Sequence, residues 1–175
     1  LNEAFPARFL LGLGVSHGHL VAGVRKHTYN KPYSGMVEYL DAMDSALYMS
    51  PKGETPAQMV LAALGPKMLR LAAERTAGAH PYFVPPEHTV TAREALGPEP
   101  LLAVEQMVVL DEDPETARDT ARKNMAIYLG LPNYANNLMR LGFTEEELTE
   151  GGGSDRVVDA VVAWGSEDDV LARVQ

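Results

Sequence analysis

The stretch MVLAALGPKMLRLAAER, residues 59–75, decides the fold that this sequence predicts. It begins with a run of apolar residues without polar alternation, which is typical of a strand buried on both faces. Gly65 ends the run, and Pro66 stands where a first helical residue would, ahead of a segment that favours a helix. A buried strand that passes directly into a helix indicates a parallel sheet with helices outside it.

The alternation of strand and helix extends to both sides of this stretch. Apolar runs predict three further strands, over residues 8–14, 78–84 and 101–110. An apolar stripe at helical spacing predicts a helix through Met36, Leu40, Met43 and Leu47. Two more helices are expected over residues 87–95 and 113–130, and loops over residues 15–32 and 50–56.

Beyond Leu131 the pattern changes, and only helices are expected. Proline, glycine and capping residues bound them at residues 132–142, 144–148, 154–165 and from 166 onward. The strand-helix order fits two architectures, an open doubly wound sheet and a (β/α)8 barrel, and a barrel needs eight strands and roughly 250 residues. Since this chain has 175 residues and four predicted strands, periodicity alone leaves both architectures open.

Composition narrows the classes of function. The formal net charge of −9 argues against a protein that binds nucleic acid. We expect a cytoplasmic protein without membrane contact, because there is neither a signal-peptide pattern nor an apolar run of roughly 18 residues. No metal site is expected, since cysteine is absent and no H-E-x-x-H spacing occurs. Hydrolase motifs such as G-x-S-x-G are absent as well.

The turn between the strand and the helix of residues 59–75 is a candidate anion site. Gly65 lets the backbone approach a ligand closely, and Pro66 opens the helix. The amides of Lys67 and Met68 then point out of the positive end of the helix, with the Lys67 ammonium nearby. The alternative is a tight turn with a solvated lysine.

Two histidines follow the first predicted strand in GLGVSHGH, residues 12–19. His17 stands where the dinucleotide fingerprint G-x-G-x-x-G requires its third glycine, so that function is disfavoured. His17 is a candidate proton donor or substrate contact, and the alternative is an exposed histidine in a turn. His80 and Tyr82 lie near the end of the third predicted strand and are candidates for lining a ring pocket, although Pro81 indicates a bulge or a strand end there.

Two further polar segments interrupt apolar surroundings. Glu105 and Gln106 fall within the fourth predicted strand, so we expect at least one of them to face inward or to be paired. The segment PNYANN, residues 132–137, is either a polar substrate lid or a capped helix start.

Four segments together resemble the luciferase-like monooxygenase superfamily, and within it the branch of deazaflavin (coenzyme F420)-dependent oxidoreductases common in actinobacteria. They are ARFLLGLGVSH, YNKPYSGMVEYLDAMD, VLAALGPKMLRLAAERTAGAHPYFVPPEHT and YLGLPNYANNLMRLGFTEEEL. The resemblance covers essentially residues 1–175 as one domain. It implies a (β/α)8 TIM barrel that is partial here, with strands four to seven and the helical insertion that precedes strand eight.

The resemblance also implies an activity, namely hydride transfer between F420 and a small-molecule organic substrate. FMN is the alternative cofactor, with reduced flavin activating oxygen in a monooxygenase. A different alternative is a non-catalytic partial barrel that acts as a binding or structural partner, because open sheet edges invite association. We expect a homodimer.

Individual residues take roles by the same resemblance. His17 matches the position of an active-site acid in relatives, so an imidazole replaces that acid. Leu20 matches an asparagine that contacts the cofactor, so this hydrogen bond is not expected. The loop of Gly65, Pro66, Lys67 and Met68 matches the loop that holds the cofactor phosphate. His80 and Tyr82 are implied as contacts of the ring or the substrate.

Overall fold

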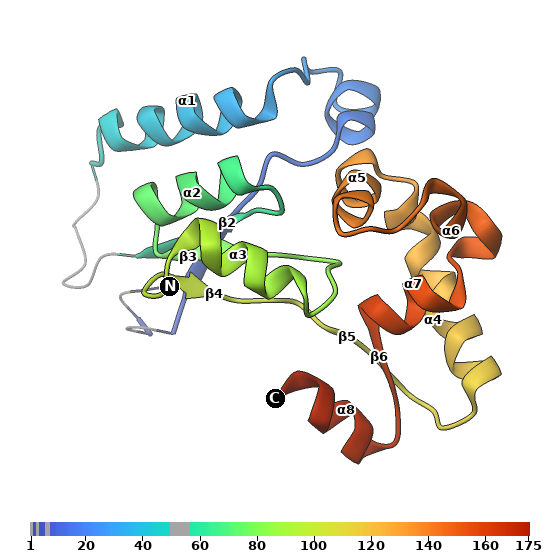
Figure 1. Ribbon diagram of the computed structural model, residues 1–175. Coiled ribbons are helices and arrows are strands. Elements are labelled where there is room, and N and C mark those ends of the chain that lie inside the picture. The colour runs from blue at the N-terminus through green and yellow to red at the C-terminus, as the bar shows by residue number, and fades with distance from the viewer. Residues whose placement is uncertain (1, 3, 6–7, 50–56) are drawn as a thin grey trace. The chain divides into compact units, whose positions relative to one another are not determined.

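The computed structural model describes residues 2, 4–5, 8–49 and 57–175, and Figure 1 shows its elements. The loop expected over residues 50–56 lies outside the described residues. The chain divides into two compact units. The first comprises Leu1–His80 with Glu94–Ala103, and the second comprises Pro81–Arg93 with Val104–Gln175.

A four-stranded parallel sheet organises the first unit, with its strands in chain order. The strands are β1 (Leu10–Leu13), β2 (Gln58–Ala62), β3 (Gly78–His80) and β4 (Leu101–Leu102). Register pairs Leu11 with Met59 and Leu61 with Ala79. The parallel α/β architecture that residues 59–75 predict is therefore confirmed, and the strands end at one common edge.

Two helices of the first unit bury apolar faces. They are α1 (Pro32–Ser45) and α2 (Pro66–Arg75), which lie side by side in Figure 1. The predicted stripe of α1 is confirmed at Met36 and Leu40, which are buried, but Leu47 lies beyond the helix and is 84% exposed. Leu69 of α2 is fully buried, and burial of such a side chain stabilises the fold by about 1.5–3 kcal/mol.

The segment after β1 differs from the expected loop. It contains a π-helix, η1 (His19–Val24), in which the Arg25 amide donates to the Leu20 carbonyl at 2.9 Å. The sequence missed this turn because HLVAGV carries neither a proline start nor a side-chain cap. The irregular turn sits directly after the strand that delivers His17 to the sheet edge.

Helices dominate the second unit. The described elements are α4 (Pro114–Leu129), α5 (Pro132–Arg140), α6 (Glu145–Thr149), the 3-10 turn η2 (Glu150–Gly152), α7 (Asp155–Val161) and α8 (Glu167–Val174). The helix α3 (His88–Leu96) belongs in part to each unit. The helix starts expected at residues 144 and 166 are confirmed, and each has a capping box, Thr144 with Glu147 and Ser166 with Asp169. Asp113 caps α4 by accepting from the Thr116 amide at 2.8 Å.

The expectation that only helices follow Leu131 is wrong. The helix predicted over residues 154–165 ends at Val161, and β6 (Val162–Gly165) runs parallel to β5 (Met107–Leu110). Val162 and Ala163 are buried, so this strand is apolar on both faces and its run of small and β-branched residues is as compatible with a strand as with a helix. The resemblance implies strands four to seven and no later strand within this chain, so β6 is a strand that the sequence analysis did not expect.

The strands predicted over residues 78–84 and 101–110 are shorter than expected. β3 stops at His80 because Pro81 has no amide to donate, which confirms a strand end there. The second run splits into β4 and β5 around Glu105 and Gln106, whose side chains are both paired as expected. The Glu105 carboxylate accepts from the Phe83 amide at 3.1 Å, and the Gln106 amide donates to the Val161 carbonyl at 2.8 Å.

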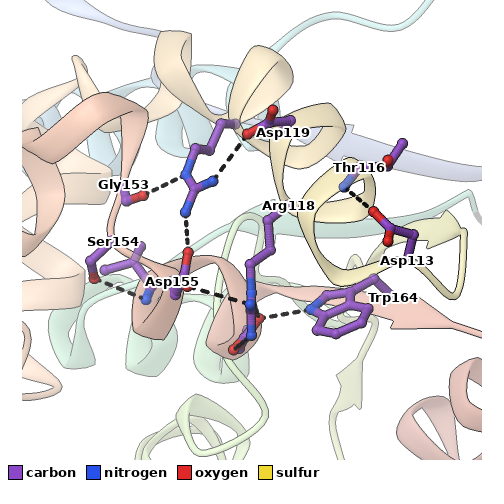
Figure 2. A network of polar contacts seen from close by, with 11 residues as sticks. Asp113, Thr116, Arg118, Asp119, Gly153, Ser154, Asp155 and Trp164 are labelled. Atoms are coloured by element: carbon purple, nitrogen blue, oxygen red, sulfur yellow. Dashed lines mark hydrogen bonds and ion pairs between the residues drawn. The ribbon is translucent and has the colours of Figure 1, made fainter.

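Polar contacts connect α4 with α7 and β6 in the second unit, as Figure 2 shows. The Arg118 guanidinium donates two hydrogen bonds to the Asp159 carboxylate, at 2.9 and 2.7 Å. The Trp164 indole donates to the same carboxylate at 2.7 Å, and Arg118 also lies 5.0 Å from the Trp164 ring centroid. Arg122 of α4 pairs with Asp155 at the start of α7.

Candidate functional site

Most of the candidate residues lie at one edge of the first unit's sheet. His17 follows β1, the loop from Gly65 to Met68 follows β2, and His80 ends β3. In parallel α/β folds this carboxyl edge is where ligands bind. Tyr82, in contrast, belongs to the second unit.

Hydrogen bonds hold the loop that carries His17, both before and after this residue. Ser16 adopts a φ of +60°, and the Tyr29 hydroxyl donates to the Ser16 carbonyl at 3.1 Å. The His17 carbonyl accepts from the amides of Leu20 and Val21 at 3.0 and 2.9 Å. The half-buried imidazole stacks on the His19 ring, with centroids 6.1 Å apart. A histidine side chain is a common proton donor or acceptor in catalysis.

The first turn of α2 has the features of an anion site. Gly65 is the N-cap in an extended conformation and no side chain caps the helix. The Leu69 amide donates to the Gly65 carbonyl at 3.0 Å, and Pro66 has no amide hydrogen. The helix itself therefore leaves the amides of Lys67 and Met68 for a ligand, and the exposed Lys67 side chain can add its charge.

The protonation of His80 follows from its partner. Its Nδ1 lies 2.6 Å from the Ala103 carbonyl of the same unit. Because a carbonyl only accepts, Nδ1 carries the proton, and in the neutral ring Nε2 is left as an acceptor. His80 is thus oriented by the backbone next to β4.

Tyr82 belongs to an aromatic cluster in the second unit, which we define as Tyr82, Phe83, Tyr128 and Tyr134. Phe83 and Tyr128 have ring centroids 5.2 Å apart, and Tyr128 and Tyr134 are 5.7 Å apart. The Tyr82 hydroxyl donates to the Tyr128 hydroxyl at 2.9 Å. Burial, followed by this hydrogen bond, raises the pKa of Tyr82, and burial also raises the pKa of Tyr134. Both phenols therefore remain neutral donors.

The turn that delivers Tyr82 is held in an unusual conformation. Phe83 is fully buried, and its backbone has a φ of +56°. Residues other than glycine rarely adopt such a φ. Two hydrogen bonds tie the turn to Glu105, one from the Phe83 amide to its carboxylate and one from its amide to the Pro81 carbonyl at 3.1 Å. Such strain persists only where its surroundings determine it, and it clusters at functional sites.

The sequence analysis missed several of these features. Tyr128 carried no signal beyond its place in a predicted helix, and Tyr134 was noted only as part of PNYANN, which turns out to start α5 at Pro132. Tyr29 was not singled out either. A cavity of about 360 Å³ opens beside Tyr29, between the end of β1 and α1. Only the tertiary structure brings its walls together.

Two kinds of feature are absent from the residues that the structure describes. Nowhere in the described part of the chain do three or more histidine or acidic side chains gather in a way that could hold a metal ion. No helix among the described residues is both long and apolar enough to cross a membrane.

Comparison with solved structures shows the fold. An F420-dependent secondary alcohol dehydrogenase, solved with an F420-acetone adduct, superposes with a TM-score of 0.71 at 10% identity over 99% of this chain. The coenzyme F420-dependent tetrahydromethanopterin reductase from Methanopyrus kandleri gives a TM-score of 0.61 at 15% identity over 94% of this chain. The matched regions make up 61% and 63% of those proteins.

Sequence comparison shows the family. No curated protein matches the chain. The family model described as luciferase-like monooxygenase, however, matches residues 1–175. Together with the parallel strand-helix architecture, this match means that the chain belongs to the luciferase-like monooxygenase family.

Proposed function

We propose that this chain is the larger part of an F420-dependent oxidoreductase, in which hydride passes between the deazaflavin and an organic substrate. The observation that carries the proposal is the uncapped start of α2 on the sheet edge that also bears His17. The family and the F420-dependent enzymes of similar fold support it.

Gly65, Pro66, Lys67 and Met68 would hold the phosphate of the cofactor. The residues fit this group, because a phosphate needs amide donors and positive charge, and Gly65 puts no side chain in its way. The bound deazaflavin would supply the hydride chemistry. The chain's part is to fix the anionic end of the cofactor and to surround the reacting region with donors and acceptors.

His17 would move the proton that accompanies hydride transfer. Its loop is anchored by Tyr29 at one end and by η1 at the other, so the imidazole is held at the sheet edge. His80, with Nε2 as an acceptor, would contribute to the ring or substrate pocket at the sheet edge of the first unit. Tyr82, whose phenol is kept neutral, belongs to the second unit, and its contact with the ring or the substrate stays a prediction.

Cofactor binding tests the proposal directly. F420 fluorescence is titrated with the chain, and the same titration is repeated with the deazaflavin that lacks its phosphate-bearing tail. We expect Lys67→Gln to weaken F420 binding about fivefold, which is roughly 1 kcal/mol, and to leave the tail-less compound unaffected. Arg70→Gln, an exposed change one turn further along α2, is the matched control. Equal affinity of the wild type for the two deazaflavins would contradict the assignment of Gly65 to Met68 as the phosphate site.

FMN is the competing cofactor, since the family name refers to monooxygenases. The same titration with FMN separates the two cofactors. A clear preference for FMN would replace the deazaflavin reaction with a reduced-flavin monooxygenase, using the same anion site. Binding of neither compound would contradict both.

A non-catalytic partial barrel is favoured by one observation, the edge of β1. Among the described residues β1 pairs only with β2, and Leu10 is 37% exposed beside the unpaired edge. Such an edge is a template for association, so the 175-residue chain taken alone would associate through it if it acted as a partial barrel. Solution mass measured across a concentration series tests this point, and a monomer throughout would count against it.

A further inference from the structure

The described walls of the cavity beside Tyr29 carry no charged side chain. Its volume is about 360 Å³, and none of the eleven described residues that line it is an acid, a base or a histidine. Leu13, Val21 and Met36 supply apolar walls, while Thr28 and Asn30 supply uncharged polar groups. Because burial of an unpaired charge is costly, this lining favours a neutral and largely apolar ligand.

Gly35 is the position at which the cavity is most simply probed, because it lines the cavity and has no side chain. It lies inside α1, where glycine is less favourable than alanine by about 1 kcal/mol. A Cβ atom placed on Gly35 meets no heavy atom within 4 Å, so helix packing does not require a glycine there. Gly35 is one of the residues that line the cavity, and a side chain there would have open space before it.

Tyr29 joins the cavity to the loop of His17. It lines the cavity and its hydroxyl donates to the Ser16 carbonyl at 3.1 Å. Its ring lies 3.3 Å from the position that a Cβ on Gly18 would take. Val21 adds a second link, since it also lines the cavity and its amide donates to the His17 carbonyl at 2.9 Å. Tyr29 therefore holds Ser16 by a hydrogen bond and lies beside Gly18, the two neighbours of His17 in the sequence.

We propose that this cavity binds the substrate of the oxidoreductase, and that the substrate is an uncharged organic molecule with an apolar body. Tyr29 is then a positioning residue, which holds the His17 loop against the bound molecule. The inference rests on the proposed function and adds the substrate class to it. A cavity of this volume is near the lower end of the roughly 300–1,000 Å³ that small-molecule sites occupy, so a compact molecule of one or two rings suits it.

A neutral fluorescent probe tests the cavity without any cofactor. N-phenyl-1-naphthylamine is titrated into the 175-residue chain, and we expect saturable enhancement of its fluorescence. Gly35→Leu fills the cavity and should weaken the probe at least about tenfold, the factor that 1.4 kcal/mol represents. Gly35→Ala improves helix propensity but adds only one methyl group, so it separates the effect of helix propensity from the effect of filling the cavity. Ala42→Leu, an exposed position on the same helix that does not line the cavity, is the matched control.

Folding is checked by thermal unfolding of each variant. Gly35→Leu and Gly35→Ala should unfold at the wild-type temperature or above it, because both relieve a helical glycine. The proposal is overturned if the wild type shows no saturable binding, if Gly35→Leu binds like the wild type, or if Ala42→Leu weakens the probe as much as Gly35→Leu.

The proposed link between the cavity and the His17 loop is tested separately, by NMR. Probe binding should shift the NMR resonance of the His17 Cε1 proton, assigned with a His17→Asn variant. Tyr29→Phe keeps the ring but removes the hydroxyl that holds the Ser16 carbonyl, so the shift of the His17 resonance at saturating probe should become smaller. An unchanged His17 resonance in the wild type would overturn the link.

Failure here and failure of the proposed function are distinguishable. F420 titrations on the same variants report on the anion site alone. Intact F420 binding without probe binding removes only the cavity proposal. Probe binding without F420 binding removes the proposed function and the assignment of the ligand as its substrate.

Discussion

The Tyr82 hydroxyl donates a hydrogen bond to the Tyr128 hydroxyl, and the two oxygens lie 2.9 Å apart. This bond joins the turn after β3 to the last part of α4, two segments separated by 46 residues in the sequence. Burial and this bond raise the pKa of Tyr82, because both disfavour its ionised form. Ionisation of this phenol therefore disfavours the folded state of the aromatic cluster.

Alkaline pH should destabilise the second unit through Tyr82. The unfolded chain releases this proton near pH 10 and the folded chain only at higher pH, so the free energy of unfolding falls as the pH rises above about 10. Urea unfolding at pH 8, 10 and 11 should show a smaller decline in Tyr82→Phe than in the wild type. Tyr48→Phe, at a residue that is 63% exposed, should decline as the wild type does. Parallel curves for the wild type and Tyr82→Phe would contradict this account.

Asp159 should contribute stability that is lost in acid. Burial alone would raise the pKa of Asp159, but the hydrogen bonds from Arg118 and Trp164 outweigh it and lower the pKa. Its contribution is therefore present above the ordinary carboxyl pKa of about 4 and is lost as the pH falls below it.

Replacing Asp159 measures that contribution. Asp159→Asn removes the charge that Arg118 pairs with, and at pH 7 we expect a loss of about 1–2 kcal/mol, reduced by partial exposure of the pair. Asp168→Asn, on the exposed side of α8, should change the free energy of unfolding by less than about 0.5 kcal/mol. Denaturant unfolding at pH 7 and pH 3 checks both values, and the gap between wild type and Asp159→Asn should narrow at pH 3.

Gly78 should be the least replaceable glycine of the sheet. A Cβ on this residue would lie 1.9 Å from the Leu101 carbonyl oxygen, and its φ of +153° is unfavourable for other residues. Gly78→Ala should therefore force β3 and β4 apart and lower the free energy of unfolding by about 1–3 kcal/mol. Gly12→Ala on β1, where a Cβ meets nothing within 4 Å, should be tolerated. Similar unfolding midpoints for the two variants would contradict the close approach of β3 and β4.

Local signals were sufficient for much of the fold. The proline that starts α2, the Asp113 cap of α4 and the Thr144 capping box act within a few residues, so the sequence predicts those helix starts. The carboxyl edge that carries His17 and Gly65 also follows from strand-helix order alone.

Non-local pairing decides what the sequence analysis missed. Val162–Gly165 becomes a strand because Met107–Leu110 lies beside it, a partner about fifty residues away that periodicity does not register. The aromatic cluster depends in the same way on the meeting of two distant segments. The cavity beside Tyr29 depends on η1, a turn that carries no start signal, so neither Tyr29 nor Gly35 could be recognised from spacing.

Glu105 should stabilise the strained turn at Phe83 through its carboxylate oxygen. Glu105→Leu removes the acceptor and leaves the Phe83 amide without it, in a turn that already has a φ of +56°. A buried amide that loses its acceptor costs about 1–3 kcal/mol, so denaturant unfolding should show a loss of that size. Glu105→Gln retains a carbonyl acceptor and should lose less than half as much. Near-ultraviolet circular dichroism of the aromatic cluster should weaken in Glu105→Leu and remain in Glu105→Gln, and equal weakening in the two variants would show that the charge rather than the hydrogen bond holds the turn.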